Sequence, residues 1–231
     1  MNKEIEDVVI SIGGSILLPE DEDTSRLTDL ADMLKENIAK KNLYLVVGGG
    51  RIARQYIYWG RNLGADEATL DHLGIETSRL NARLLKIALG KECYPVPAKD
   101  FDEAISAGNH YPIVVMGGTH PGHTTDAVAA MLAERLGTKR LINATSVDGV
   151  YTSDPKKDEG AKRLEELSYD ELIEIVSKSE TGAGPNVVFD PLAARIIKRA
   201  DINTYVLHGT DLGSLESAIR DEDFEGSRIT G

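Results

Sequence analysis

The sequence has 231 residues and a mass of 25.1 kDa, which is long enough for one well-buried domain. Its formal net charge of −12 argues against nucleic acid and anionic membranes as partners. The sequence contains no apolar run of the about 20 residues that a membrane helix needs, and its single cysteine, Cys93, excludes an internal disulfide. We therefore expect a cytoplasmic protein.

Strands and helices are predicted to alternate along the whole chain. Short apolar runs with strand composition cover residues 8–12, 43–47, 112–116, 141–144 and 204–207. Helical spacing or a helix start signal marks residues 27–38, 51–62, 73–89, 127–136, 169–177, 191–200 and 214–220. This order predicts one domain over residues 1–231, with a mostly parallel sheet and helices on both faces.

Four polar residues are predicted to cap helices at their N-termini: Ser25, Asp100, Ser168 and Asp190. Asp100 and Ser168 are each followed three residues later by glutamate, which is the spacing of a capping box. Asp190 precedes a proline that suits the first helical position, and Gly137 is a good left-handed helix stop.

Three glycine-rich turns each follow a predicted strand: Gly13–Ser15, Gly48–Gly50 and the stretch Gly117–Asp126. Since the carboxyl ends of parallel strands meet at one edge of a sheet, these turns should gather there. Backbone N–H groups in such turns, and the helix N-termini behind them, bind anions. We therefore expect a site that holds several phosphate groups at once, with local cations and a metal ion offsetting the negative charge of the chain.

Two common phosphate motifs are rejected. Gly117–Thr124 has the spacing of a P-loop, but His123 replaces the lysine that grips the phosphate. Gly48–Ala53 matches a dinucleotide-binding turn, but the acids that would complete it, Asp66, Glu67 and Asp71, do not follow a second strand. The hypothesis that the protein is an NAD-dependent dehydrogenase would rest on Gly48–Ala53 alone.

These turns, together with Val147–Pro155 and Asp190–Ala193, resemble in order and spacing the motifs of the amino acid kinase superfamily. The chain is most similar to the archaeal uridylate kinases of that superfamily, and the resemblance covers essentially all of it. It implies a three-layer αβα sandwich around a central, mainly parallel sheet. Within it, residues 1–137 would form an acceptor-binding lobe and residues 138–231 an ATP-binding lobe.

The activity implied by the resemblance is transfer of the γ-phosphoryl group of ATP to UMP. Mg²⁺ would be held mainly through the nucleotide phosphates, with no metal site built from protein side chains. The implied assembly is a hexamer made of dimers. The helix over residues 51–62 carries four consecutive apolar residues, Tyr56–Trp59, which suits either a subunit interface or a buried helix.

The resemblance also implies roles for particular residues. Arg54 and Asp190 would act at the transferred phosphoryl group. ATP would be bound by Gly14, Ser15, Gly50, Arg54, Thr145, Ser146, Tyr151 and Asp154. The acceptor would be bound by Gly49, Asp71, Thr119, His120, Pro121, Gly122, His123, Thr124 and Thr125.

Several of these residues have a simpler structural interpretation. Asp71 could accept hydrogen bonds from a ribose diol or cap the helix at residue 73. Asp154 could do the first or merely form a turn with Pro155. Asp190 could cap its helix and still face the site, whereas Arg54 could be a solvated charge. His120 and His123 lack a third ligand and are more suited to shaping the loop than to binding metal.

The chain departs from the superfamily at Ser11, where most members have a lysine that stabilises the transferred phosphoryl group. A hydroxyl carries no charge, so another cation must act; the candidates are Arg54, Lys156 and Lys157. Ser146 likewise replaces a common asparagine. Alternative functions are kinases of isopentenyl phosphate, carbamate or an acidic amino acid, or a non-catalytic nucleotide-binding or oxyanion-storage subunit, which Ser11 would favour.

Overall fold

The computed structural model describes residues 5–18, 23–153, 158–180 and 188–231. Its main sheet has the strand order β3-β2-β1-β4-β8-β9-β7. The strands are β1 (Glu6–Ile12), β2 (Lys41–Val47), β3 (Ile113–Met116), β4 (Arg140–Thr145), β7 (Glu166–Ser168), β8 (Asn203–His208) and β9 (Ser227–Thr230). Neighbouring strands are parallel except for β8 and β9, which are antiparallel. The parallel αβα architecture predicted from the sequence is thus confirmed.

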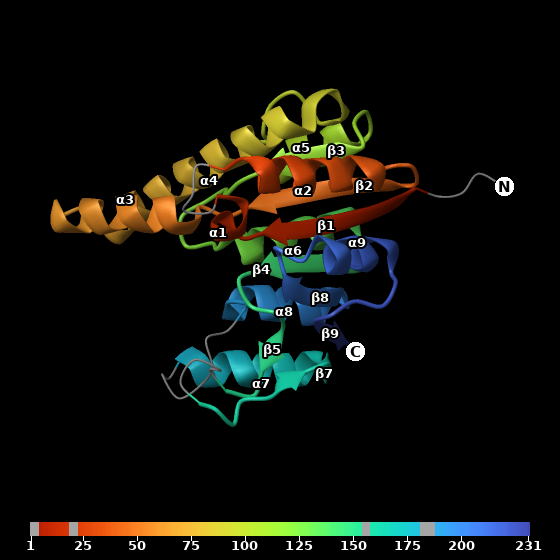
Figure 1. Ribbon diagram of the computed structural model, residues 1–231. Helices are drawn as coiled ribbons and strands as arrows, with labels where there is room; N and C mark the ends of the chain where they lie inside the picture. Colours follow the sequence, from red (N-terminus) through yellow and green to blue (C-terminus); the bar gives the residue numbers. More distant parts are fainter. Residues whose placement is uncertain (1–4, 19–22, 154–157, 181–187) are drawn as a thin grey trace.

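Helices cover both faces of this sheet (Figure 1). They are α1 (Gly14–Leu17), α2 (Ser25–Glu36), α3 (Gly50–Asn62), α4 (Glu67–Leu89), α5 (Phe101–Gly108), α6 (Thr125–Leu136), α7 (Tyr169–Glu180), α8 (Pro191–Ala200) and α9 (Leu212–Arg220). A 3₁₀ turn, η1 (Gly90–Glu92), follows α4, and β5 (Val150–Tyr151) pairs with β6 (Arg163–Leu164) in a small separate hairpin.

Successive side chains of β1 are buried in two different cores, one on each face of the sheet. Val8, Ile10 and Ile12 are buried in a core with α2, α4 and α9. Val9 is buried in the other core, with α5, α6, α7 and α8. The nearly all-apolar run over residues 8–12 is therefore explained, because successive side chains point to opposite faces and both faces are covered.

The predicted helix starts were mostly right. Asp100 and Asp190 accept backbone N–H hydrogen bonds at the N-termini of α5 and α8, and Ser168 and Glu171 form the predicted reciprocal pair before α7. The assignment of Ser25 was wrong, because Ser25 is the first residue of α2 and follows the N-cap residue Thr24. The Asp23 carboxylate accepts from the Ser25 N–H at 2.9 Å, so Asp23 provides the polar group instead.

Several elements differ from the prediction, which had no helix at α1 and no strand at β5, β6 or β7. Helix α4 begins at Glu67, six residues before the predicted start, with Asp66 as its N-cap. The prediction missed β9, because its sequence Ser-Arg-Ile-Thr has too few apolar residues to signal a strand. Its pairing with β8 and β7, rather than its own composition, makes it a strand.

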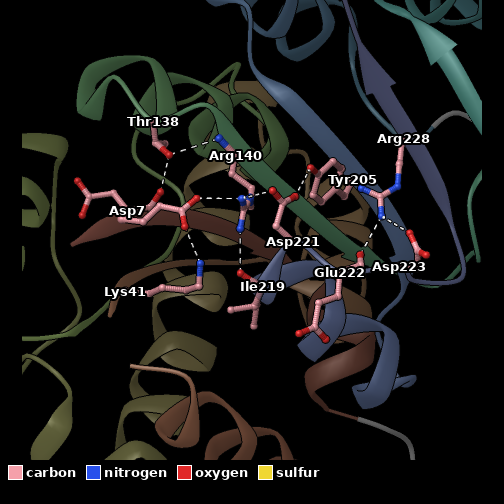
Figure 2. A network of polar contacts seen from close by, with 11 residues as sticks. Asp7, Lys41, Thr138, Arg140, Tyr205, Ile219, Asp221, Glu222, Asp223 and Arg228 are labelled. Atoms are coloured by element: carbon pink, nitrogen blue, oxygen red, sulfur yellow. Dashed lines mark hydrogen bonds and ion pairs between the residues drawn. The ribbon is translucent and has the colours of Figure 1, made fainter. Parts of the chain in front are cut away.

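At the amino ends of the parallel strands, a polar network joins distant segments of the chain. The Arg140 side chain, only 11% exposed, forms ion pairs with Glu6 at 3.0 Å and Asp221 at 2.9 Å. Figure 2 shows its guanidinium directed at Asp221, which also accepts a hydrogen bond from the Tyr205 hydroxyl at 2.7 Å. Arg228 stacks over the Tyr205 ring, its Cζ atom 5.0 Å from the ring centre. This network links β1, β4, β8, α9 and β9 at the edge opposite the glycine turns.

Among the described residues, no helix is both long enough and apolar enough to cross a membrane.

Candidate functional site

The first two glycine turns pack directly against each other at the carboxyl edge of the sheet. A Cβ atom added to Gly14 would lie 2.3 Å from the Gly48 carbonyl oxygen and 2.5 Å from the Gly50 nitrogen. Gly50 also has a left-handed backbone, with φ of 63°. Only glycine permits both the approach and the conformation, so β1 and β2 can bring two backbone turns together here.

Two adjoining cavities open around these turns. The larger, of about 420 Å³, is lined by Gly49, Gly50, Ala53, Arg54, Ile57, Asp71, Gly74, Ile75, Ser78, Gly118, His120, Gly122, His123, Thr124 and Thr125. We call it the acceptor cavity, after the role that the resemblance implies for these loops. The smaller, of about 210 Å³, is lined by Ser11, Gly13, Gly14, Ser15, Ile16, Gly48, Gly49, Gly50, Arg54, Thr125, Asp126, Asn143, Thr145 and Ser146. We call it the donor cavity.

The two cavities share the Gly49–Gly50 turn, Arg54 and Thr125. Arg54 is the fifth residue of α3, and its guanidinium donates a hydrogen bond to the Ser15 hydroxyl at 3.1 Å. The side chain is exposed, yet it is held at the boundary between the cavities. A cation there can contact an anion in either cavity.

The acceptor loop is tied to neighbouring helices. The Gly122 amide donates to the Asp71 carboxylate at 2.7 Å, which connects the loop to α4. Asp71 does not cap a helix, as one interpretation of the sequence had it, because α4 already begins at Glu67 and Asp71 lies in its second turn. The Thr124 side chain caps α6 by accepting from the Ala127 amide at 3.1 Å.

Asp190 serves as N-cap of α8 and also reaches the site. Its Oδ1 atom accepts from the Leu192 and Ala193 amides at 2.8 and 3.0 Å. Its Oδ2 atom accepts a hydrogen bond from the Thr124 hydroxyl of the acceptor loop. The two roles weighed for Asp190 are therefore sterically compatible, although Asp190 does not itself line either cavity.

Asp126 is a residue to which the sequence reading gave no role. Its carboxylate lines the donor cavity and accepts a hydrogen bond from the Ser11 hydroxyl at 2.9 Å. Burial raises the pKa of this carboxyl to about 7, and the nearby Asp190 charge acts in the same direction. The signal available in the sequence was its position on the first turn of a helix that follows a phosphate-type loop.

Ser11 is explained by the same contact. It is 2% exposed and lies on the β1 face that also carries Val9, which is directed toward α6. A serine here places a neutral donor against the Asp126 carboxyl, at the position where the resemblance predicts a lysine. Among the described residues that line the donor cavity, Arg54 is the one with a cationic side chain.

Some predicted residues are not brought into these cavities. Tyr151 lies in the β5–β6 hairpin, where its hydroxyl donates to Asp148 at 2.9 Å. Asp154 and two of the three candidate cations, Lys156 and Lys157, lie outside the described residues. Thr119 and Pro121 belong to the acceptor loop without lining its cavity, and the Thr119 hydroxyl is buried with no partner among the described residues.

The two loop histidines lie side by side on the acceptor cavity, with ring centres 6.3 Å apart. Within the described part of the chain, no group of three or more His, Cys, Asp or Glu side chains is arranged to hold a metal ion. A metal that enters with nucleotide phosphates fits this arrangement, because Mg²⁺ usually takes most of its ligands from phosphates and water.

Comparisons of the sequence and of the structure with known proteins point to the same family. The sequence profile described as the amino acid kinase family matches residues 7–208. The chain is 46% identical over 223 residues to a uridylate kinase of Methanospirillum hungatei, covering 96% of this chain and 94% of that protein. It is 46% identical over 222 residues to a uridylate kinase of Pyrococcus abyssi, covering 96% and 98% respectively. The crystal structure of uridylate kinase from Archaeoglobus fulgidus superposes with a TM-score of 0.86 at 43% identity, covering 96% of this chain and 99% of that chain.

Proposed function

We propose that this chain, which belongs to the amino acid kinase family, is a uridylate kinase that transfers the γ-phosphoryl group of ATP to UMP. The observation that carries the proposal is the pair of adjoining cavities with one shared wall, formed by Gly49, Gly50 and Arg54. A transfer between two phosphorylated substrates needs two anion sites whose ends meet, and a single-substrate binding protein does not.

The roles follow from the geometry of each cavity. ATP phosphates would lie in the donor cavity against Gly14, Ser15 and the N-terminus of α3, whose first amides have no side-chain cap. UMP would lie in the acceptor cavity, with its phosphate at the shared wall and its ribose toward Asp71. Arg54 would contact both phosphate groups and reduce their mutual repulsion during transfer.

The sizes of the electrostatic contributions decide which groups must stabilise the transition state most. A helix N-terminus contributes at most about 2 kcal/mol to anion binding, whereas enzymes commonly lower a barrier by about 8 kcal/mol or more. The loops therefore orient the phosphates, and Arg54 supplies charge at the point of transfer. Mg²⁺, when bound with ATP, neutralises phosphate oxygens and supplies the remaining electrostatic stabilisation.

The test is an ADP-release assay with Mg-ATP, in which UMP, CMP, dTMP and isopentenyl phosphate are offered separately. We expect turnover with UMP and none of comparable rate with isopentenyl phosphate. Turnover of isopentenyl phosphate alone would assign the chain to another activity of the same fold. ATP binding without turnover of any acceptor would favour the non-catalytic alternative, which the neutral Ser11 supports.

We also propose that residues 1–137 and 138–231 form two lobes with different binding roles. Every residue that lines the acceptor cavity falls within residues 1–137, and the donor cavity adds Asn143, Thr145 and Ser146 from residues 138–231. This distribution supports an acceptor-binding first lobe and a second lobe that completes the ATP site. With one cysteine, the protein is suited to the reducing cytoplasm, where its nucleotide substrates are made.

We also propose that the protein assembles as a homo-oligomer, a hexamer of three dimers by analogy with the uridylate kinases that it resembles. Helix α3 projects beyond the arrowheads of β1 and β2 alongside α4 (Figure 1). Tyr56, Tyr58 and Trp59 on it are 48–59% exposed, so the buried-helix interpretation is wrong for this chain. Light scattering should give a mass several times 25.1 kDa for the wild type and a smaller mass for Trp59→Glu. An unchanged mass would remove α3 from the interface.

A further inference from the structure

Helix α4 contacts the backs of both phosphate-facing loops through buried polar side chains that the proposed mechanism does not use. Asn81 is 3% exposed and Ser78 is 1% exposed. With Gly74, they lie at positions four and three residues apart and therefore share one face of the helix. The Gly74 carbonyl oxygen would lie 3.3 Å from a Cβ atom on Gly49, so this face lies directly behind the turn.

The Asn81 amide is bonded to the shared wall of the two cavities. Its Nδ2 atom donates to the Gly48 carbonyl oxygen at 2.9 Å and to the Gly49 carbonyl oxygen at 3.2 Å. An amide nitrogen has two N–H groups, so it can serve both carbonyls at once. The contact joins residues more than 30 positions apart in the sequence, and the Asn81 amide that makes it is buried.

These two bonds determine which way the turn presents its N–H groups. In a planar trans peptide unit, the carbonyl and the following N–H point in opposite directions. Because the Gly48 and Gly49 carbonyls point at Asn81, the Gly49 and Gly50 N–H groups point away from α4. Gly49 and Gly50 line both cavities, so their N–H groups lie on the ligand side of the turn.

Ser78 holds the acceptor loop from the same helix face. Its hydroxyl accepts a hydrogen bond from the Gly118 amide at 2.8 Å and donates to the Ile75 carbonyl at 2.7 Å. One rigid helix thereby fixes the donor turn through Asn81 and the acceptor loop through Ser78. In-line phosphoryl transfer depends on that mutual alignment.

We propose that Asn81 is a positioning residue for phosphoryl transfer, which fixes the Gly48–Gly50 turn so that its amides face the donor phosphates. The inference rests on the proposed function, and Asn81 itself contacts neither substrate. Removing the two hydrogen bonds leaves the buried Gly48 carbonyl without this donor, while the Gly49 carbonyl still accepts from the Ala53 amide at 3.3 Å. The Gly48–Gly49 peptide unit can then rotate, which displaces its amide from the phosphate position.

The test compares Asn81→Asp with Thr77→Val. The aspartate has nearly the same shape but presents oxygens to both carbonyls, so the turn must rotate. Thr77 is buried on the same helix, and within the described part of the chain its hydroxyl bonds to the Leu73 carbonyl alone, at 2.7 Å, so the control also loses one hydrogen bond of a buried side chain. We expect N81D to lower kcat/KM for ATP about 100-fold, since misplacement by about 1 Å has that effect. T77V should stay within about twofold of wild type in kcat/KM, because its lost bond is internal to the helix.

Melting temperatures separate positioning from structure. If N81D unfolds, Asn81→Ser, which has a short hydroxyl donor and leaves room for water, replaces it in the comparison. The inference is overturned if a folded Asn81 variant keeps wild-type kcat and KM for both substrates. It is also overturned if T77V and the Asn81 variant lose activity equally.

Failure of the proposed function is recognised separately. It would appear as a wild-type enzyme that does not phosphorylate UMP at all. In that case, calorimetric titration of wild type and N81D with ADP still tests the inference, because the turn binds donor phosphates with or without an acceptor. Equal ADP affinities would then contradict it, and weaker binding to N81D would support it.

Discussion

At the scale of single residues, the site depends on where very few charges are placed in an acidic chain. The net charge of −12 repels nucleotides, and Arg54 at the boundary of both cavities opposes that repulsion locally. Ser11 occupies the position on β1 where a lysine was expected, and its hydroxyl donates a hydrogen bond to the Asp126 carboxyl. Arg54 thus adds a positive charge to the site, whereas Ser11 adds none.

Arg54→Ala should lower kcat/KM for both substrates by about 100- to 1,000-fold, the usual effect of removing one group that stabilises the transition state. Steady-state kinetics with ATP and UMP varied in turn provide the measurement. Arg61→Ala is the matched control, because Arg61 lies on the same helix and, among the residues that the structure describes, forms its ion pair with the exposed Glu67 alone. Unchanged turnover of R54A would remove Arg54 as the replacement for the missing lysine.

Asp126 should make the stability of the protein depend on pH. Its pKa in the folded chain, about 7, lies above its ordinary value of 3.8, so the folded state binds the proton more tightly. The stabilisation is complete below about pH 4 and is lost as the pH rises through 7.

The comparison is urea unfolding of wild type and Asp126→Asn at pH 5 and pH 8, without nucleotide. We expect D126N to gain about 2 kcal/mol of stability relative to wild type as the pH rises from 5 to 8. This is less than the full about 1.4 kcal/mol per pKa unit, because the carboxyl is partly exposed. A stability difference that does not change with pH would contradict the raised pKa.

At the scale of elements, helix N-termini connect folding to the site. Thr124 caps α6 and Asp190 caps α8, and the two caps are hydrogen-bonded to each other. The ends of two helices are thus fixed by the same pair of side chains that lie beside the acceptor cavity. A substitution can therefore change capping and chemistry together, and the two effects need separate variants.

The variants Asp190→Ser and Asp190→Ala separate the effect on capping from the effect on chemistry. Serine preserves capping, so its stability should remain near that of wild type, while alanine should cost about 1 kcal/mol. If the carboxylate matters for transfer, both variants should lose activity to a similar degree. Full activity of the serine variant would limit Asp190 to its structural role. Thermal unfolding and the ADP-release assay provide the two readouts.

At the scale of the whole molecule, the two edges of the sheet have different tasks. The carboxyl edge holds the glycine turns and cavities, whose backbone groups must stay available for ligands. The amino edge is held by the Arg140 network, which joins the first strand to the last helix and, through Tyr205 and Arg228, to the last strand (Figure 2). Stability can be lost at that edge without altering the site directly.

Arg140→Ala should destabilise the fold by about 2 kcal/mol, below the about 3 kcal/mol or more of a fully buried pair, because both partner carboxylates are about half exposed. Lys139→Ala is the control, since its ion pair with Asp201 is exposed on both sides and should contribute about 0.5 kcal/mol or less. Chemical denaturation measures both. Equal effects of the two substitutions would show that the network adds nothing to stability.

The sequence by itself determined the class of fold and the three glycine turns. Apolar runs, helical spacing and capping residues are local signals, and parallel topology brings the ends of β1, β2 and β3 to one edge. The same local signals could not reveal β9, because Ser227–Thr230 becomes a strand only by pairing with β7 and β8. The start of α4 was placed too late for a related reason, since Asp66 was weighed only as part of a dinucleotide motif.

Tertiary structure alone decided how the site residues meet. The contact of Ser11 with Asp126 spans 115 positions, and that of Asn81 with Gly48 spans 33, so no spacing rule links them. The raised pKa of Asp126 likewise arises from burial by other segments, and the exposure of Trp59 depends on where α3 projects from the sheet. Local chemistry is encoded by neighbours in the sequence, whereas burial, electrostatic environment and mutual alignment come from residues that only folding brings together.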